Sequence, residues 1–314
     1  MSAIDSRTLG ARIRLIAAAA ILIVLALRLG ARPFLDGLVH TDPRALAFAL
    51  VVTAATTGCS ARRWCLIASG LGVGMSFRSA YRSYYRSQFL NATLPGGVLG
   101  DVHRGYRHGQ DAGAVGRGLL SVAIDRASGQ VTQVALAVAA VPLLPTALRG
   151  WVLAVLGALM VAGLVLLSLS RARREVAAAL TGAWAEVAVL SALAAGGHVL
   201  VFLVAARTAG VTASAPHLLA LALLVLVASA IPVSVAGWGP REGAAAWAFG
   251  AAGLGAAAGV EVAVVYGVMS LVATLPGMLI LRAAPNNPVT SAPTANRWIQ
   301  AKGEPTWTSG PTYS

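Results

Sequence analysis

Long apolar blocks separated by short polar clusters run through most of the chain. A helix needs about 20 mostly apolar residues to cross the hydrocarbon core of a bilayer. Eight blocks are candidates for such helices, at residues 15–29, 45–60, 119–144, 151–169, 183–206, 217–235, 243–258 and 260–281. The pattern therefore predicts an all-α fold, a polytopic transmembrane helix bundle of about eight spans.

Two apolar stretches depart from the simple pattern. The first block follows three arginines and could be a signal peptide. No small-x-small cleavage site follows it and further apolar blocks come after, so we expect an uncleaved helix. The stretch 65–75, after Arg62-Arg63-Trp64, is too short to cross, so an interfacial or re-entrant piece is expected there.

Composition agrees with a membrane protein. Hydrophobic residues make up 57% of the chain and charged residues only 11%, whereas a soluble domain carries about 25% charged residues. The net charge of +13 could indicate nucleic acid, but the arginines cluster at the ends of apolar blocks, as orientation signals do. We therefore expect no nucleic-acid partner, and attraction to anionic lipid heads instead.

The distribution of basic residues also predicts the orientation. Arginine and lysine accumulate on the cytoplasmic side of membrane proteins. With the N-terminus inside, few basic residues fall on the outer side: Arg28, Arg32, Arg44, Arg149 and Arg207. We therefore expect a multi-pass protein of the cell (cytoplasmic) membrane with both termini cytoplasmic, in which residues 62–117 make no net crossing.

One membrane domain is expected. Residues 1–282 form the predicted integral membrane domain, and residues 283–314, rich in Pro, Asn, Thr and Ser, are predicted to be a disordered cytoplasmic tail. Nothing outside the apolar blocks is long enough to fold as a soluble catalytic domain. The two cysteines and the scattered histidines match no metal-site spacing, and no phosphate-binding loop is present, so no cofactor is expected.

Aromatic residues recur at every fourth position from Phe77 to Phe89, and an arginine follows each of the first three. Positions four apart share a face of a helix, so the stretch predicts an aromatic stripe beside an arginine stripe. Aromatic rings and arginines settle at the headgroup level. We favour anchoring at the inner membrane surface over a lipid-recruiting role.

A first broken element covers residues 91–104. Pro95 and the neighbouring glycines interrupt any helix, and irregular backbone beside membrane helices is tolerated only where it is buried or lines a wet cavity. Asp101 and Arg104 lie three positions apart and can pair on one helical face. We interpret the stretch, with Asn91 at its start, as a re-entrant, site-forming element; the alternative is a simple cytoplasmic loop.

Asp125 and Arg126 lie inside an otherwise apolar block. If the helix begins near Arg117, they are about 12–13 Å along it at 1.5 Å per residue. Charges at such a depth are costly unless they face the bundle interior or water, which makes them functional-site candidates. A structural ion pair with Arg241 or Glu242 is an equally good reading of the sequence.

A second broken element covers residues 231–243, where two prolines and three glycines surround Arg241 and Glu242. A half-helix beginning at Pro240 would point its N-terminal amides at the break, and such an end favours an anion. Broken helices at corresponding places in two halves are how many transporters build a central site.

At these stretches the sequence resembles the lysylphosphatidylglycerol synthase transmembrane-region family, the flippase-like part of the bacterial multiple peptide resistance factor and of shorter stand-alone relatives. Leu99, Asp125 and Pro240 depart from the family pattern. The motifs that carry the resemblance are Arg63-Trp64; Phe89 and Asn91; Leu94-Pro95-Gly96-Gly97 with Gly100-Asp101 and Arg104; Asp125-Arg126; and Pro232, Ser234, Gly237, Gly239, Arg241 and Glu242.

The resemblance implies a protein that binds, and translocates, a lipid with an anionic or aminoacylated head. Full-length relatives carry a soluble aminoacylating domain that has no counterpart here, so we expect no enzyme activity. The alternatives are a membrane enzyme acting on a polyprenyl or phospholipid substrate, and an accessory subunit of an envelope machine; a homo-oligomer is also open. The expected substrate-binding residues are Asn91, Asp101, Arg104, Asp125, Arg126, Arg241 and Glu242.

Overall fold

The computed structural model describes residues 16, 20–39, 41–94, 96–169, 172–230 and 238–282. Every element in these residues is a helix, which confirms the all-α prediction. The predicted tail, residues 283–314, lies outside the described residues, as do most of the residues before position 20. A helix at Ala20–Leu29 comes first. The helices after it are α2 (Arg32–Val39), α3 (Pro43–Gly70), α4 (Phe77–Thr93), α5 (Leu99–Asp111), α6 (Val115–Ala140), the 3-10 turn η1 (Val141–Leu143), α7 (Thr146–Leu169), α8 (Arg173–Leu180), α9 (Trp184–Thr208), α10 (Ala215–Ser229), α11 (Pro240–Ala251), α12 (Ala256–Thr274) and α13 (Pro276–Arg282).

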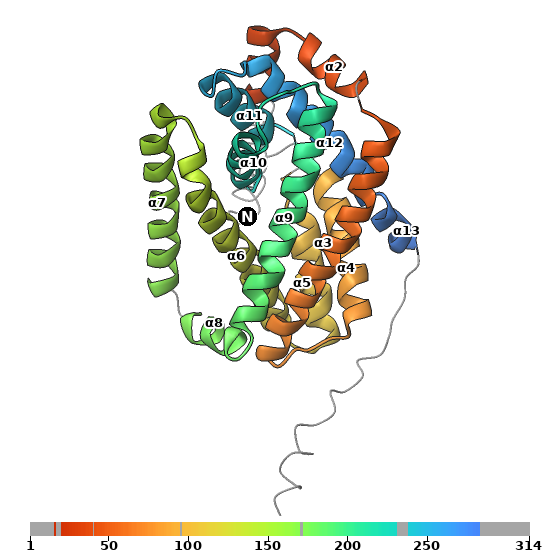
Figure 1. Ribbon diagram of the computed structural model, residues 1–314. Helices are drawn as coiled ribbons and strands as arrows, with labels where there is room; N and C mark the ends of the chain where they lie inside the picture. The colour runs from red at the N-terminus through yellow and green to blue at the C-terminus, as the bar shows by residue number, and fades with distance from the viewer. Residues whose placement is uncertain are drawn as a thin grey trace, which may run out of the picture.

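Three described helices are both long and apolar enough to cross a membrane: Pro43–Gly70, Trp184–Thr208 and the continuous stretch Ala256–Ile280. They pack on one another, because α3 contacts α9 and α12 contacts both. Figure 1 shows them running along the length of the bundle beside α6. The bundle therefore has a membrane-spanning core, but the predicted count of eight spans is not confirmed.

Two pairs of helices form hairpins instead of full spans. α10 and α11 contact each other, and so do α4 and α5. α10 has 15 residues and α11 has 12, which at 1.5 Å per residue gives about 22 and 18 Å. Both are shorter than the roughly 30 Å hydrocarbon core. The predicted spans at 217–235 and 243–258 thus correspond to two half-length helices.

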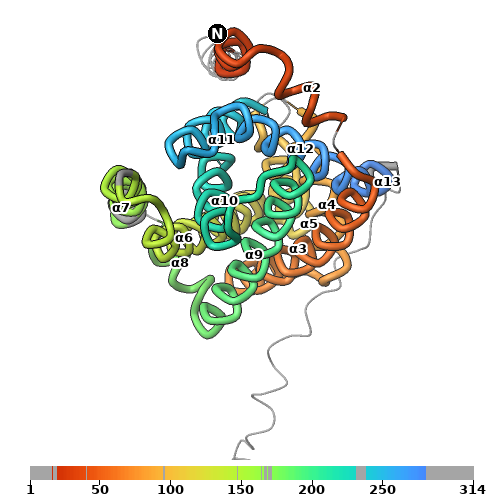
Figure 2. The backbone as a smooth tube through the Cα atoms, turned by 45° about the horizontal axis from the view of Figure 1, so that its top comes forward, coloured from red at the N-terminus to blue at the C-terminus, as the bar shows by residue number. Residues whose placement is uncertain are grey.

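The two hairpins lie toward opposite ends of the bundle. In Figure 1, α4 and α5 occupy the lower part of the molecule and α10 and α11 the upper part. Figure 2 shows α10 lying among α6, α9 and α11, with α7 at the periphery, and contacts join α10 to those three helices. The end of α10 and the start of α11 are therefore brought into the bundle beside α6 and α9.

The prediction of an interfacial or re-entrant piece at residues 65–75 is wrong for residues 65–70. Residues 65–70 continue α3, which ends at Gly70. At the other end of α3, the carboxylate of Asp42 accepts a hydrogen bond from the Arg44 amide and caps the helix. The arginines at positions 62 and 63 do not end the helix because both are paired: Arg62 with Glu186 and Arg63 with Asp125. Paired charges remove the cost that would have stopped the span.

Glycines let α5 and α6 approach closely. A Cβ atom added at Gly118 of α6 would overlap with the backbone of Gly109 in α5, and one added at Gly105 would press on α6. Small residues at such a contact allow helix backbones to come together. The close packing holds the charged residues of α5 directly against those of α6.

Candidate functional site

A buried cluster of charges joins α3, α5 and α6. Arg104 Nη2 lies 3.0 Å from Asp101 Oδ1 and 3.2 Å from Asp125 Oδ2. Arg63 Nε lies 2.7 Å from Asp125 Oδ1. Asp125 is fully buried. The predicted pair of Asp101 with Arg104 is confirmed, whereas the structural partners of Asp125 are Arg63 and Arg104 and not residues of α11.

Both carboxylate oxygens of Asp101 have partners from the α4–α5 hairpin, which we call the first hairpin, and one also pairs with α6. Ser87 Oγ donates to Oδ1 at 2.9 Å, Asn91 Nδ2 donates to Oδ2 at 2.7 Å, and Arg126 forms an ion pair with the same oxygen. The side-chain oxygen of Asn91 accepts from the Gly100 amide at 2.8 Å. Asn91 therefore clamps the start of α5 to the end of α4, which favours a site-forming element over a simple loop.

Arg104 lies between two aromatic rings. Its guanidinium carbon is 4.3 Å from the Trp64 ring centre and 4.0 Å from that of Tyr84. Its Nε and Nη1 atoms are buried and have no hydrogen-bond partner, so the ring faces supply the attraction that water would otherwise give. The Tyr84 hydroxyl donates to Asp125 Oδ2 at 3.0 Å and accepts from Arg63 at 3.3 Å.

A separate ion pair lies at the start of α11, in the second hairpin, which α10 and α11 form. Arg241 Nη2 lies 2.6 Å from Glu242 Oε1, and Glu242 Oε2 accepts from the Gly239 amide at 2.6 Å. Gly239 has a φ of 118°, which favours glycine. The predicted half-helix from Pro240 is confirmed, but its N-terminal end already holds an anion, the carboxylate of Glu242. The predicted break at 231–237 lies outside the described residues.

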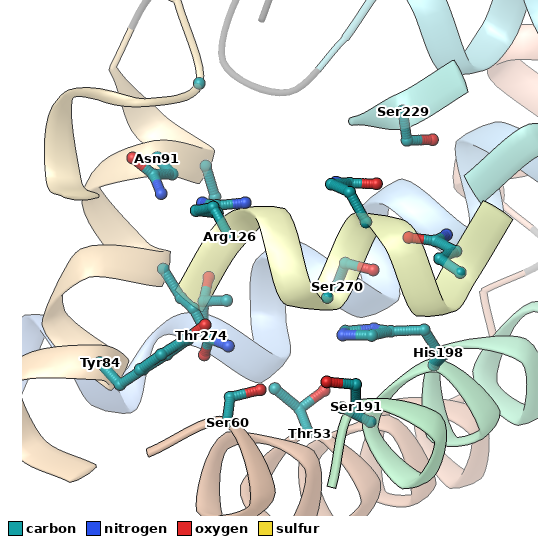
Figure 3. A pocket seen from close by; sticks show the side chains of 18 of the residues that line it. Thr53, Ser60, Tyr84, Asn91, Arg126, Ser191, His198, Ser229, Ser270 and Thr274 are labelled. Carbon is teal, nitrogen blue, oxygen red and sulfur yellow. The ribbon is translucent and has the colours of Figure 1, made fainter. Parts of the chain in front are cut away.

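A cavity of about 350 Å³ lies between the two hairpins. Its arginines are Arg63, Arg126 and Arg241, and Asn91 also faces it. Figure 3 shows Asn91 and Arg126 on one side of the view and His198 and Ser229 on the other. Most of the remaining lining is uncharged and polar: Thr53, Ser60, Tyr84, Gln88, Gln130, Gln133, Ser191, Tyr266, Ser270 and Thr274.

The seven predicted site residues thus fall into two groups. Asn91, Arg126 and Arg241 line the cavity. The other four lie in the ion pairs behind it: Asp101, Arg104, Asp125 and Glu242. Arg104 and Arg241 are both buried in the bundle.

Arg63 belongs to the candidate site but is not among the residues that the sequence predicted for it. It is buried, lines the cavity, and binds Asp125 and Ser191. The signal was present, because Arg63 stands within an otherwise apolar run that continues to residue 70. Gln130 and Gln133, one and two turns beyond Arg126, were similarly visible as polar interruptions of the third block.

The prediction for the aromatic stripe needs correction. The aromatic stripe forms as expected, with the rings of Phe77, Tyr81 and Tyr85 in sequential contact. However, Tyr85 is buried and donates to the Ala273 carbonyl at 3.2 Å, so at that position the stripe packs inside the bundle and does not anchor at the surface. Glu186, inside the predicted apolar block 183–206, is about half exposed and pairs with Arg62.

Comparison with known proteins adds one finding. A family model described as the lysylphosphatidylglycerol synthase TM region matches residues 12–277. No curated protein and no solved structure matches the chain. The match spans both hairpins, the charge cluster and the cavity.

Proposed function

The chain belongs to the lysylphosphatidylglycerol synthase TM-region family, and on this premise we propose that it is a lipid flippase of the cytoplasmic membrane. It would hold the phosphate-bearing or aminoacylated head of a membrane lipid in the cavity and move the lipid between leaflets. Under this proposal the protein binds and transports, and it catalyses no covalent change.

The polar cavity in the middle of an apolar bundle carries the proposal. Ionisable side chains at membrane depth are expensive and mark substrate pathways. Three arginines line the cavity, and arginine pairs well with phosphate because its planar fork matches two phosphate oxygens. A purely structural ion-pair network would have no need of an open, amide-rich space beside it.

The arrangement of the hairpins supports movement through the cavity. Ser229 at the end of α10 and Arg241 at the start of α11 both line it, and so do Asn91 and Gly97 at the tip of the first hairpin. Two half-length elements that meet at one site from opposite ends resemble the broken helices of transporters. Each tip would close one side of the pathway.

The orientation is part of the proposal. Exposed arginines gather at the end of the bundle that holds α8 and the open end of the α4–α5 hairpin, namely Arg78, Arg82, Arg107, Arg117, Arg173 and Arg174. Such clusters mark the cytoplasmic side. The N- and C-termini would then both be cytoplasmic, and the α10–α11 hairpin would enter from the outer side.

Reconstitution of the full chain in liposomes tests the proposal. Liposomes containing a trace of fluorescent phosphatidylglycerol are treated with a membrane-impermeant quencher, which reports how much labelled lipid reaches the outer leaflet. We expect faster exchange than in protein-free liposomes. Arg126→Gln and Arg241→Gln should slow the exchange, because each removes a cation from the cavity lining.

Arg207→Gln is the matched control, since Arg207 lies at the end of α9 and bonds only locally to the Val211 carbonyl among its described contacts. It should exchange lipid like the wild type. Exchange no faster than in protein-free liposomes would refute the proposal, and wild-type rates in both cavity variants would refute the site. An accessory subunit would instead purify without lipid, and an enzyme would release a product in the same vesicles.

A further inference from the structure

The acidic residues of the site are turned away from the cavity. Asp101, Asp125 and Glu242 are each buried and each bound by at least one arginine. Among the described residues that line the cavity there is no aspartate or glutamate. A ligand in this space therefore meets guanidinium groups and neutral dipoles but no carboxylate.

The charge cluster behind the cavity is unbalanced. Within the described part of the chain, Arg63, Arg104 and Arg126 form ion pairs with two carboxylates, those of Asp101 and Asp125. The Arg241–Glu242 pair is neutral by itself. One positive charge is left over, and the most accessible guanidinium in the cluster is that of Arg126, whose side chain is 44% exposed. A single phosphodiester anion would neutralise this excess.

The neutral lining suits a particular kind of headgroup. Amides and hydroxyls surround the arginines, including Gln88, Gln130, Gln133 and Ser270. These groups both donate and accept hydrogen bonds, so they match ligand hydroxyls, which also do both. An added ammonium would need acceptors with negative charge, and placing it among arginines costs repulsion that no carboxylate in the lining offsets.

Resting on the flippase proposal, we infer that the cavity selects a lipid whose head is a single phosphodiester carrying an uncharged, hydroxyl-bearing group, and that it discriminates against aminoacylated heads. The phosphate lies between Arg126 and Arg241, and the hydroxyl-bearing part contacts the glutamines of α6. Of the two headgroup classes considered for the site, phosphate-bearing and aminoacylated, the inference retains the phosphate-bearing head without an aminoacyl group.

Competition binding to the purified full chain tests the inference. Fluorescent phosphatidylglycerol is displaced in detergent by short-chain phosphatidylglycerol or by its lysyl ester. We expect the unmodified lipid to displace the tracer at a concentration at least about tenfold lower, the ratio for one uncompensated like-charge contact of modest strength. Equal potency, or tighter binding of the lysyl ester, would overturn the inference while leaving lipid binding at the cavity intact.

A charge introduced into the cavity sharpens the test. Gln130→Glu adds one carboxylate to the lining and should move the ratio of the two potencies at least about tenfold toward the lysyl ester. Gln110→Glu makes the same change on the exposed end of α5, outside the cavity, and should leave the ratio unchanged. A shift of equal size in both variants would overturn the inference, and failure of the tracer to bind the wild type would overturn both it and the proposed function.

Discussion

Arg63 of α3 and Asp125 of α6 form an ion pair in which Nε and Oδ1 are 2.7 Å apart and both side chains are almost fully buried. Sixty-two positions separate them in the chain. Asp125 also binds Arg104 of α5 and Tyr84 of α4. One carboxylate thus ties the first hairpin to two of the long helices that enclose it.

Asp125→Ala should destabilise the protein strongly. Removing this carboxylate takes away the ion-pair partner of Arg63 and leaves Arg104 with Asp101 alone, and breaking a buried pair in this way costs about 3–5 kcal/mol. Thermal unfolding in detergent measures the loss. Glu186→Ala is the control, because it breaks an ion pair that is half exposed and should cost at most about 1 kcal/mol. Similar losses in the two variants would contradict the role given to the cluster.

Tyr84→Phe separates the hydroxyl of Tyr84 from its ring. The ring would still cover Arg104, but the hydrogen bond to Asp125 at 3.0 Å would be lost. A hydrogen bond to a charged group contributes about 1.5–3 kcal/mol, so the free energy of unfolding should fall by that amount. Tyr106→Phe, at an exposed position on α5, should shift it by far less. An unchanged unfolding temperature in Tyr84→Phe would show that the ring alone matters.

Gly267→Ala should impair lipid exchange more than it impairs folding. A Cβ atom at Gly267 would overlap with the guanidinium of Arg241, so the arginine must move away from its place in the cavity lining. The exchange assay and thermal unfolding would be run on the same preparation. Gly157→Ala in α7, where an added Cβ meets nothing within 4 Å, is the control. Full exchange activity in Gly267→Ala would argue against a role for the Arg241 position.

Cysteine labelling should place the ends of the two hairpins on opposite sides of the membrane. In a chain with Cys59 and Cys65 replaced by serine, Thr212→Cys before α10 should react with an impermeant reagent in intact cells. Gln110→Cys at the end of α5 should react only after the membrane is opened. Both positions are exposed. The reverse pattern would invert the orientation, and labelling of both in intact cells would rule out hairpins that enter from opposite sides.

The sequence predicted the class of fold because an apolar block constrains a helix without reference to anything else in the chain. It also located the interruption between α4 and α5 and the start of α11 at Pro240, since proline and glycine interrupt helices and proline favours the first helical position. The pair of Asp101 with Arg104 was predictable because their spacing is local. All of these depend on short stretches of chain.

What escaped prediction depends on contacts between distant segments. Arg62 and Arg63 look identical as orientation signals, yet one pairs at the surface and the other lines the cavity. The choice is made by which face of α3 meets α6 and α9. Likewise, Glu242 could have faced a ligand, and only the turn at Gly239 reveals that its carboxylate caps its own helix. Side-chain direction at such positions follows from packing.

The hairpins that stop halfway have an electrical consequence. A polar cavity is easier to polarise than the hydrocarbon beside it, so a membrane potential would fall mainly across the apolar layers that remain. Each elementary charge carried through the full potential exchanges about 2.3 kcal/mol per 100 mV. A head bearing one net negative charge would therefore be driven by voltage toward the positive side of the membrane, whereas a net-neutral head would cross without feeling it.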